Sequence, residues 1–505
     1  MNVTDLNCEY LGLSRLCLME SAGKSLAEEV GKIAVYTFSK PVKIIIFTGS
    51  GGNGGDGFVA ARYLLNRGYD VDIYMLKDKN GIYSNEARTN LEILENMKPR
   101  FSHLTLHNLK TIEDINNCEV ASTDSFSEFI IIDGILGTGI NGKLRDNIKR
   151  AIEIINNSNG LTISVDVPSG LDPLTGQIQD AAVKPQYTVS FHKVKTGIHK
   201  AGEEKVGGIV TCDIGIPIEA EYFINYGDMI KLNNRSENSH KGNNGKILIV
   251  GGSKEYCGAP AIAGLAAIGA GADLVYVATP QSSSLAISTH PDLIVRPLEG
   301  DYLTTNHAEK ILELAEKVDA VLLGPGASIN DETGKLLNIL ASKIKKPLVL
   351  DADALKQIKP QIIKNREDII LTPHIFEFKS FFGKDVKLNL DSCDFSEVDE
   401  NISEFQQIVR QINGVVIIKG AIDLVVQKTK FKLNKSGNPG MTVGGTGDAL
   451  AGIATSLLSK GLNAFDAATL AIFINGLAGD EAYLEKGYGF GATDLVSYIG
   501  KVIKG

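Results

Sequence analysis

Short apolar runs alternate with amphipathic segments along nearly the whole chain. Residues 41–47 (PVKIIIF) predict a buried strand, residues 58–68 (FVAARYLLNRG) have helical spacing and end at a glycine, and residues 70–76 (DVDIYML) alternate like a second strand. A similar unit begins at residues 246–253 (KILIVGGS). Strands that alternate with helices are typical of α/β domains with a parallel sheet, so we expect this class throughout.

The chain has 505 residues, which predicts more than one domain. The α/β pattern is interrupted at residues 233–245 (NNRSENSHKGNNG), a polar and irregular stretch. We therefore predict a first domain in residues 1–217, a linker in residues 218–234 and a second domain in residues 235–505.

Composition narrows the classes of function. A hydrophobic fraction of 43% indicates a folded protein, and a formal charge of −9 argues against nucleic acid as the main partner. The start of the sequence lacks the pattern of a signal peptide, and the most apolar stretch, residues 258–278, is broken by glycines and Asp273, so no membrane partner is expected. The cysteines form no CxxC pattern, which argues against a disulfide framework or a zinc site and favours the cytoplasm: Cys8, Cys17, Cys118, Cys212, Cys257 and Cys393.

A glycine-rich stretch, GSGGNGGDG, follows the first predicted strand and has three interpretations. It satisfies the dinucleotide-binding pattern G-x-G-x-x-G, but Asp56 would repel a pyrophosphate, and the expected ribose-binding acid is absent from the end of the next strand. Alternatively, Asp56 only caps a helix in a tight turn. In the third interpretation, Asn53 and Asp56 are functional groups, because amide and carboxylate oxygens suit an alkali or alkaline-earth cation.

Two further predicted strands end in acids, Asp133 and Asp166. In doubly wound sheets, ligands bind outside the carboxyl ends of the strands, so these carboxylates should converge with the glycine-rich stretch. Residues 137–143 (GTGINGK) offer backbone N–H groups and a lysine to a diphosphate, and Asp166 can act as a general acid or base. The alternative is that both acids cap the helices that follow.

Four separated motifs in residues 1 to about 217 resemble the YjeF amino-terminal family, the NAD(P)H-hydrate epimerases: GSGGNGGDGFVAAR, DGILGTGI, VDVPSGLDPLTG and SFHKVKTG. The resemblance implies a Rossmann-like fold and a potassium ion held by Asn53, Asp133 and Ser169. It also implies that the hydrated nucleotide is bound by Gly52, Asn53, Gly54, Gly55, Asp56, Gly137, Thr138, Gly139, Ile140, Asn141, Gly142, Lys143 and Asp166. The family usually has asparagine where this chain has Gly52.

The second half contains another glycine-rich turn before a predicted helix, residues 437–452 (GNPGMTVGGTGDALAG). Residues Gly445 to Asp448 can direct N–H groups at phosphate charge, and Asp448 can take a proton from a hydroxyl. No GK[ST] follows, so this is not a Walker A loop. The structural alternative is a packing turn with a capping aspartate.

Together with that turn, residues 235–505 resemble the YjeF carboxy-terminal family, the ADP- or ATP-dependent NAD(P)H-hydrate dehydratases, whose fold is ribokinase-like. The other matching motifs are KILIVGGS, GAPAIAGLAAIGAGADLVYV, LLGPGAS, LVLDADAL, LTPHIFEF and VVIIKGAIDLVV. The resemblance implies substrate contacts at Ala259, Gly326, His374 and Asp448. It implies adenine-nucleotide contacts at Lys419, Gly420, Ala421, Ile422, Asp423, Thr446 and Gly447. The family's Pro-Gly after the histidine is replaced here by Ile375 and Phe376.

The two resemblances together imply a bifunctional repair enzyme that epimerises NADH hydrate and NADPH hydrate and dehydrates the S epimer. Asp166 and Asp448 are the candidate catalytic residues, and Mg²⁺ is expected with the nucleotide. Such folds commonly self-associate, so a homo-oligomer is expected. A ribokinase-like small-molecule kinase, a non-catalytic scaffold and a dehydrogenase are the competing interpretations.

Overall fold

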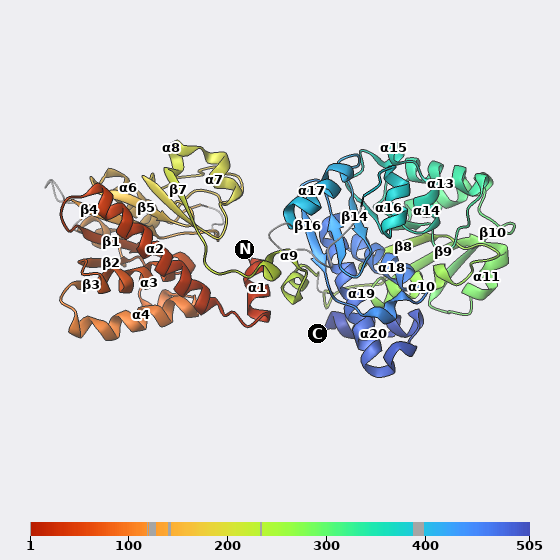
Figure 1. Ribbon diagram of the computed structural model, residues 1–505, viewed down its shortest axis with the longest axis horizontal. Helices are drawn as coiled ribbons and strands as arrows, with labels where there is room; N and C mark the ends of the chain where they lie inside the picture. The colour runs from red at the N-terminus through yellow and green to blue at the C-terminus, as the bar shows by residue number, and fades with distance from the viewer. Residues whose placement is uncertain are drawn as a thin grey trace. The chain divides into compact units, whose positions relative to one another are not determined.

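The computed structural model describes residues 2–118, 120, 128–139, 143–232, 235–386 and 398–504. The chain forms two compact units, and each has its own sheet (Figure 1). The first unit comprises Leu11–Pro217, and the second comprises Met1–Tyr10 together with Ile218–Gly505.

The sheet of the first unit has the strand order of a Rossmann-like fold. Its seven described strands follow the order β3-β2-β1-β4-β5-β6-β7, and all neighbours are parallel. The order reverses between β1 and β4, which is where doubly wound sheets bind ligands. The strands are β1 (Lys43–Thr48), β2 (Val71–Met75), β3 (Leu104–Asn108), β4 (Phe129–Gly134), β5 (Leu161–Val165), β6 (Tyr187–Phe191) and β7 (Gly208–Cys212).

One helix of the first unit begins earlier than its sequence predicts. Helix α3 (Gly52–Asn66) includes most of the glycine-rich stretch, which was expected to be a turn before Phe58. The glycines permit close packing: a Cβ on Gly54 would lie 2.5 Å from the Gly49 carbonyl oxygen. The other helices are α2 (Arg15–Thr37), α4 (Asn85–Met97), α5 (Ile112–Asn116), α6 (Asp146–Asn157), α7 (Thr196–Ala201) and α8 (Glu203–Val206), with 3₁₀ turns η1 (Lys79–Gly81) and η2 (Lys98–Arg100).

The sheet of the second unit is larger. Within the described residues it has nine strands in the order β10-β9-β8-β11-β12-β13-β14-β15-β16, parallel as far as β14 and antiparallel beyond it, consistent with the predicted ribokinase-like α/β fold. The strands are β8 (Lys246–Val250), β9 (Leu274–Pro280), β10 (Leu293–Leu298), β11 (Ala320–Leu323), β12 (Leu348–Leu350), β13 (Ile369–Leu371), β14 (Val415–Ile418), β15 (Asp423–Val426) and β16 (Phe431–Asn434).

Helices cover both faces of this sheet, so its strands are buried on both sides. Ile247 and Ile249 of β8 face one hydrophobic core, whereas Leu248 and Val250 face the other. The helices are α10 (Ala259–Gly269), α11 (Gln281–Ile287), α12 (Ala308–Glu316), α13 (Asp331–Lys343), α14 (Asp353–Gln357), α15 (Pro360–Ile363), α16 (Ile375–Phe382), α17 (Val398–Val409), α18 (Thr446–Ser459), α19 (Ala464–Lys486) and α20 (Ala492–Lys504), with 3₁₀ turns η5 (Thr305–His307), η7 (Pro439–Thr442) and η8 (Gly487–Gly489).

The domain boundaries differ from the prediction at both ends of the first unit. Helix α1 (Asn2–Tyr10) belongs to the second unit, as do α9 (Ile218–Tyr222) and η4 (Tyr226–Lys231) of the predicted linker; Figure 1 shows the red α1 beside α9. Asn7 donates hydrogen bonds to the Ala220 carbonyl (3.0 Å) and to Asp228 Oδ2 (3.1 Å). Asp228 is fully buried and pairs with Lys432 at 3.5 Å. These buried polar contacts fix segments that the sequence alone presents as a terminus and a linker.

Two observations bear on the expected environment. In the described parts of the chain, no helix is long and apolar enough to cross a membrane. None of the five described cysteines forms a disulfide bond: Cys8, Cys17, Cys118, Cys212 and Cys257. Cys393 lies outside the described residues.

Candidate functional site

The carboxylate of Asp133 lies in β4, beside the point where the strand order of the first sheet reverses. It is fully buried and accepts hydrogen bonds from Ser164 Oγ (2.8 Å), Ser169 Oγ (2.5 Å) and Ser169 N (2.9 Å). Burial raises the pKa of Asp133, and the serine donors oppose this effect. The structure therefore joins Asp133 to Ser169, two of the three residues expected to hold potassium.

Asn53 completes this group through the backbone of Leu136. Its Nδ2 donates to the carbonyl oxygens of Val165 (2.5 Å) and Leu136 (3.3 Å), and Leu136 N donates to Ser169 Oγ (2.8 Å). This network brings together one carboxylate, serine hydroxyls and backbone carbonyls, which are oxygen groups of the kind that a hard cation of low charge prefers. Over the described ranges, no cluster of three His, Cys, Asp or Glu residues could hold a metal ion.

A second acidic pair lies at the end of β5. Asp166 follows this strand directly and is 6% exposed, and Asp56 of α3 is 8% exposed. Burial raises the pKa of Asp56 well above its usual value, the Asp166 carboxylate raises it further, and the Lys195 ammonium lowers it. Lys195 forms a buried ion pair with Asp166. A carboxyl group with a raised pKa thus lies near another that is paired with a cation.

The predicted phosphate-binding run is only partly described. Gly137 lies against Asn53, because a Cβ there would come within 2.1 Å of Asn53 Oδ1. Thr138, Gly139 and Lys143 are exposed, whereas Ile140, Asn141 and Gly142 lie outside the described residues.

The remaining glycines of this region differ in their surroundings. Gly52 is exposed, and a Cβ on it would meet no atom within 4 Å, so the asparagine that the family usually has would fit here. Gly55 is buried, and a Cβ there would come within 2.5 Å of the Met19 side chain.

In the second unit, Asp448 lies in the first turn of α18. This helix begins directly after Gly445, which has a left-handed backbone conformation (φ 98°). Burial raises the pKa of Asp448 to about 7, with a further contribution from the Asp351 carboxylate, while Lys419 opposes both. A base with a pKa near neutrality is well matched to taking a proton from a hydroxyl group. Thr446 is buried, and its hydroxyl donates to the Met441 carbonyl (2.8 Å), which fixes the turn before the helix.

Lys419 connects several of the residues predicted to contact the nucleotide. Its Nζ lies 3.6 Å from Asp351 Oδ1, and a Cβ on Gly447 would lie 3.3 Å from the same Nζ. Its backbone N donates to the Pro373 carbonyl (3.0 Å), which brings His374 alongside. The structure therefore places the side chain of Lys419 next to the turn that carries Asp448.

The segment after Lys419 makes a tight turn into β15. Gly420 N donates to Asp423 Oδ1 (3.0 Å), and Asn434 Nδ2 donates to Asp423 Oδ2 (2.9 Å). Burial raises the pKa of Asp423 to about 6, against these two donors. Ala421 is exposed and Ile422 is half-buried between them. The Asp423 carboxylate already accepts the two hydrogen bonds that hold this turn, so it has less capacity to accept further hydrogen bonds.

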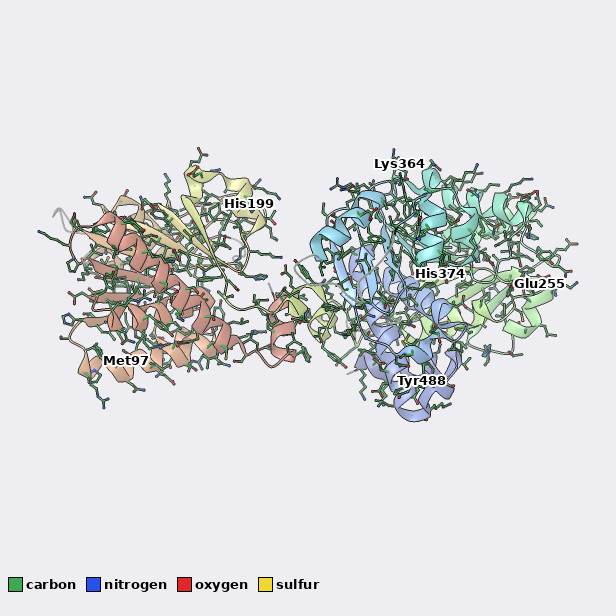
Figure 2. The ribbon with its side chains drawn as sticks, in the orientation of Figure 1. Met97, His199, Glu255, Lys364, His374 and Tyr488 are labelled. Carbon is green, nitrogen blue, oxygen red and sulfur yellow. The ribbon has the colours of Figure 1, made fainter. Side chains whose placement is uncertain are left out.

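His374, labelled in Figure 2, caps the amino end of α16. Its Nδ1 accepts from Glu377 N (3.2 Å), and its own N donates to Glu377 Oε2 (3.1 Å). The Phe376 side chain, 73% exposed, lies edge-on to the histidine with ring centroids 6.0 Å apart. The departure from the family motif therefore adds an exposed aromatic ring beside His374.

Gly326 and Ala259 meet where the strand order of the second sheet reverses, between β8 and β11. Gly326 is buried with φ 60°, and a Cβ on it would lie 2.6 Å from the Tyr256 carbonyl and 3.4 Å from Ala259 Cβ. Only glycine fits this left-handed position so close to another backbone.

Three charged residues were not singled out from the sequence. Lys195 lies in the SFHKVKTG motif, and Asp351 and Asp353 lie in LVLDADAL at the end of β12. Their position after strands could have identified them as candidates. The sequence does not show, however, which residues the fold places beside them, and their place in a site depends on those partners.

Comparisons with known proteins agree with this division. Residues 15–197 match the family described as YjeF-related protein N-terminus, and residues 247–501 match the NAD(P)H-hydrate dehydratase family. The bifunctional NAD(P)H-hydrate repair enzyme Nnr of Methanothermobacter thermautotrophicus is 45% identical, with 100% of this chain and 94% of that protein covered. The protein of the same name from Hyperthermus butylicus is 40% identical over 98% of this chain and 90% of that protein.

A crystal structure of the ADP/ATP-dependent NAD(P)H-hydrate dehydratase from Bacillus subtilis covers 56% of this chain and 98% of its own. The two sequences are 22% identical, and the TM-score is 0.46. The full-length matches, and not this structure, establish the family. The chain belongs to the bifunctional NAD(P)H-hydrate repair enzymes, with an epimerase domain followed by a dehydratase domain.

Proposed function

We propose that the first unit interconverts the R and S epimers of NADH hydrate and NADPH hydrate through Asp166, and that the second unit dehydrates the S epimer through Asp448 with ADP or ATP. The observation that carries the dehydratase assignment is the position of Asp448. It lies in the first turn of α18, and Lys419 lies against Gly447 of the same turn.

In the epimerase, Asp166 handles the proton. The hydrated carbon bears a hydroxyl group and the ring nitrogen, so its configuration is lost when the nitrogen lone pair expels the hydroxyl or when the ring opens. Asp166 delivers a proton in one direction and withdraws it in the other. Asn53, Asp133 and Ser169 would hold the potassium ion, which supplies positive charge next to the bound nucleotide.

In the dehydratase, Asp448 takes the proton of the substrate hydroxyl, whose oxygen attacks the terminal phosphoryl group of the nucleotide. Lys419 and the N–H groups at the start of α18 stabilise the phosphoryl charge. The ring nitrogen then expels phosphate with the former hydroxyl oxygen, and loss of a ring proton restores the dihydropyridine. Mg²⁺ bound together with the nucleotide would neutralise phosphate charge during the phosphoryl transfer.

The test is recovery of reduced-nicotinamide absorbance from a mixture of both hydrate epimers, with Mg²⁺ and K⁺ present and with ADP or ATP supplied separately. The wild type should recover nearly all of the absorbance. Asp166→Asn should recover only the share of the S epimer, and Asp448→Asn none. No recovery with either nucleotide would refute the dehydratase assignment, and a stable phosphorylated small-molecule product would favour a ribokinase-like kinase instead.

Self-association and a cytoplasmic location stay predictions of the sequence. The choice between ADP and ATP is decided by the two arms of the same assay.

A further inference from the structure

The ion pair between Lys195 and Asp166 is nearly closed to water. The side chains of Lys195 and Asp166 are 8% and 9% exposed. Besides this pair, Lys195 Nζ donates to the Phe191 carbonyl (2.9 Å), and Phe191 N donates to the same carboxylate oxygen that Lys195 contacts (3.1 Å). One oxygen of Asp166 is thus held by two donors, one from the last residue of β6 and one from the segment that follows it.

The backbone of Asp166 is held in an unfavourable conformation. Its φ is 63°, in the left-handed region that non-glycine residues seldom adopt. Asp166 N donates to the Val189 carbonyl (2.7 Å) of β6. A strained residue persists when its surroundings over-determine its position, and such residues concentrate at functional sites. The contacts from the β6 segment therefore select this orientation of the carboxyl group.

The charges around this pair make the lysine necessary for the carboxylate. Asp56 of α3 is a second buried carboxyl group that interacts electrostatically with both Asp166 and Lys195. Asp133, at the end of the neighbouring strand, directs its oxygens to Ser164 and Ser169. Without Lys195, the two buried carboxyl groups would lose this compensating cation, and each would disfavour the charged form of the other.

We propose that Lys195 is a positioning residue of the epimerase, which keeps the Asp166 carboxylate charged and oriented toward the hydrated carbon. This inference rests on the proposed role of Asp166. It adds that the charge of Lys195, and not only its hydrogen bonds, is needed for full epimerase activity at pH 6.

The test compares Lys195→Gln with Lys195→Arg. Both variants keep a donor for Asp166 and the Phe191 carbonyl, but only arginine keeps the charge. Lys200→Met is the matched control, since Lys200 is a lysine of α7 whose Nζ donates to the exposed Leu174 carbonyl (3.2 Å). Pure R hydrate is incubated without nucleotide, and the S epimer is separated by chromatography over a range of pH. Thermal melting of each variant verifies that the first unit is folded.

We expect the glutamine variant to lose up to about tenfold in kcat at pH 6 with little change in KM. The acidic limb of its kcat profile should lie at higher pH than that of the wild type, because the variant has lost an opposite charge at close range. The arginine variant and the control should keep the wild-type profile. A folded glutamine variant with the wild-type profile, or with only a raised KM, would overturn the inference. If the wild type itself does not epimerise, the proposed function fails first.

Discussion

Asp448 combines two properties at a single residue. Its carboxylate can accept a proton near neutral pH, and its charged form is unfavourable in the folded protein because the group is buried. Because its pKa is about 7 in the folded protein, the carboxyl group prefers the neutral form, and its charge costs stability as pH rises from about 4 to about 7. Catalysis by a general base needs the charged form. Activity and stability therefore depend on this residue in opposite directions.

The first prediction concerns pH and the variant Asp448→Asn. For the wild-type dehydratase, kcat/KM should fall about tenfold per pH unit below pH 7, because the free enzyme loses its ionised base. Asp448→Asn should abolish dehydration at every pH, yet at pH 7.5 it should stabilise the second unit by on the order of 2 kcal/mol, after allowance for partial exposure to water. Calorimetry at pH 5 and pH 7.5 measures the difference; equal melting of the two proteins at pH 7.5 would contradict it.

Which individual residues the sequence predicts depends on whether their roles are local. Asp133, Asp166 and Asp448 lie at strand ends or open a helix, and these positions can be predicted from the pattern of apolar runs. Lys195 and Asp351 also come after strands, but their roles depend on their partners, Asp166 and Lys419, which come from distant segments. The roles assigned to these residues in binding and catalysis stay predictions.

At the scale of elements, the sequence of α3 correctly predicts which residues lie after the first strand, but it predicts the wrong backbone conformation for them. Glycine is a poor helix former, so GSGGNGGDG indicates a turn. The structure makes most of it helical, because the strand end and α2 approach too closely for larger residues. Local propensity yields here to packing, and the consequence is that Asn53 and Asp56 are held on a rigid helix.

The second prediction tests this packing with Gly54→Ala. Alanine favours a helix over glycine by about 1 kcal/mol, but a Cβ at Gly54 would lie 2.5 Å from the Gly49 carbonyl oxygen. We expect a loss of about 1–3 kcal/mol in the stability of the first unit and loss of epimerisation. Gly52→Ala is the control, because its Cβ meets open space. Chemical denaturation measures the stability of the two variants, and the epimer assay measures their activity. Equal stability of Gly54→Ala and Gly52→Ala would contradict the prediction, because it would show that the close contact at Gly54 does not lower the free energy of unfolding.

At the scale of the whole molecule, the chain begins and ends in the same unit. The first sheet and its helices, Leu11–Pro217, are inserted between α1 and α9, which contact each other. The number of domains and their α/β class could be predicted from the repeated strand and helix pattern. The insertion could not, because α1 is short and its main partner, Asp228, is 221 positions away from Asn7.

The third prediction follows from that contact. Asn7→Ala removes the hydrogen bonds to the Ala220 carbonyl and Asp228, so it should destabilise the second unit, by about 1–3 kcal/mol, although the substitution lies at the start of the sequence. Glu9→Ala, at an exposed position of the same helix, serves as the control. Dehydration activity after a heat challenge reports on the second unit, and epimerisation reports on the first. Selective loss of epimerisation would contradict the assignment of α1 to the second unit.

This arrangement has a consequence for the order in which the protein is made. Helix α1 is synthesised before its partners, because Asp228 is added 221 residues after Asn7. At about 5–20 residues per second, that interval is roughly 10–45 s, during which the whole epimerase sequence is synthesised. If the epimerase folds in that time, its compact structure replaces a long flexible loop, and the entropy lost when α1 closes on η4 no longer depends on those residues. Helix α1 is thus without its partners during this interval, and early folding of the epimerase favours completion of the dehydratase.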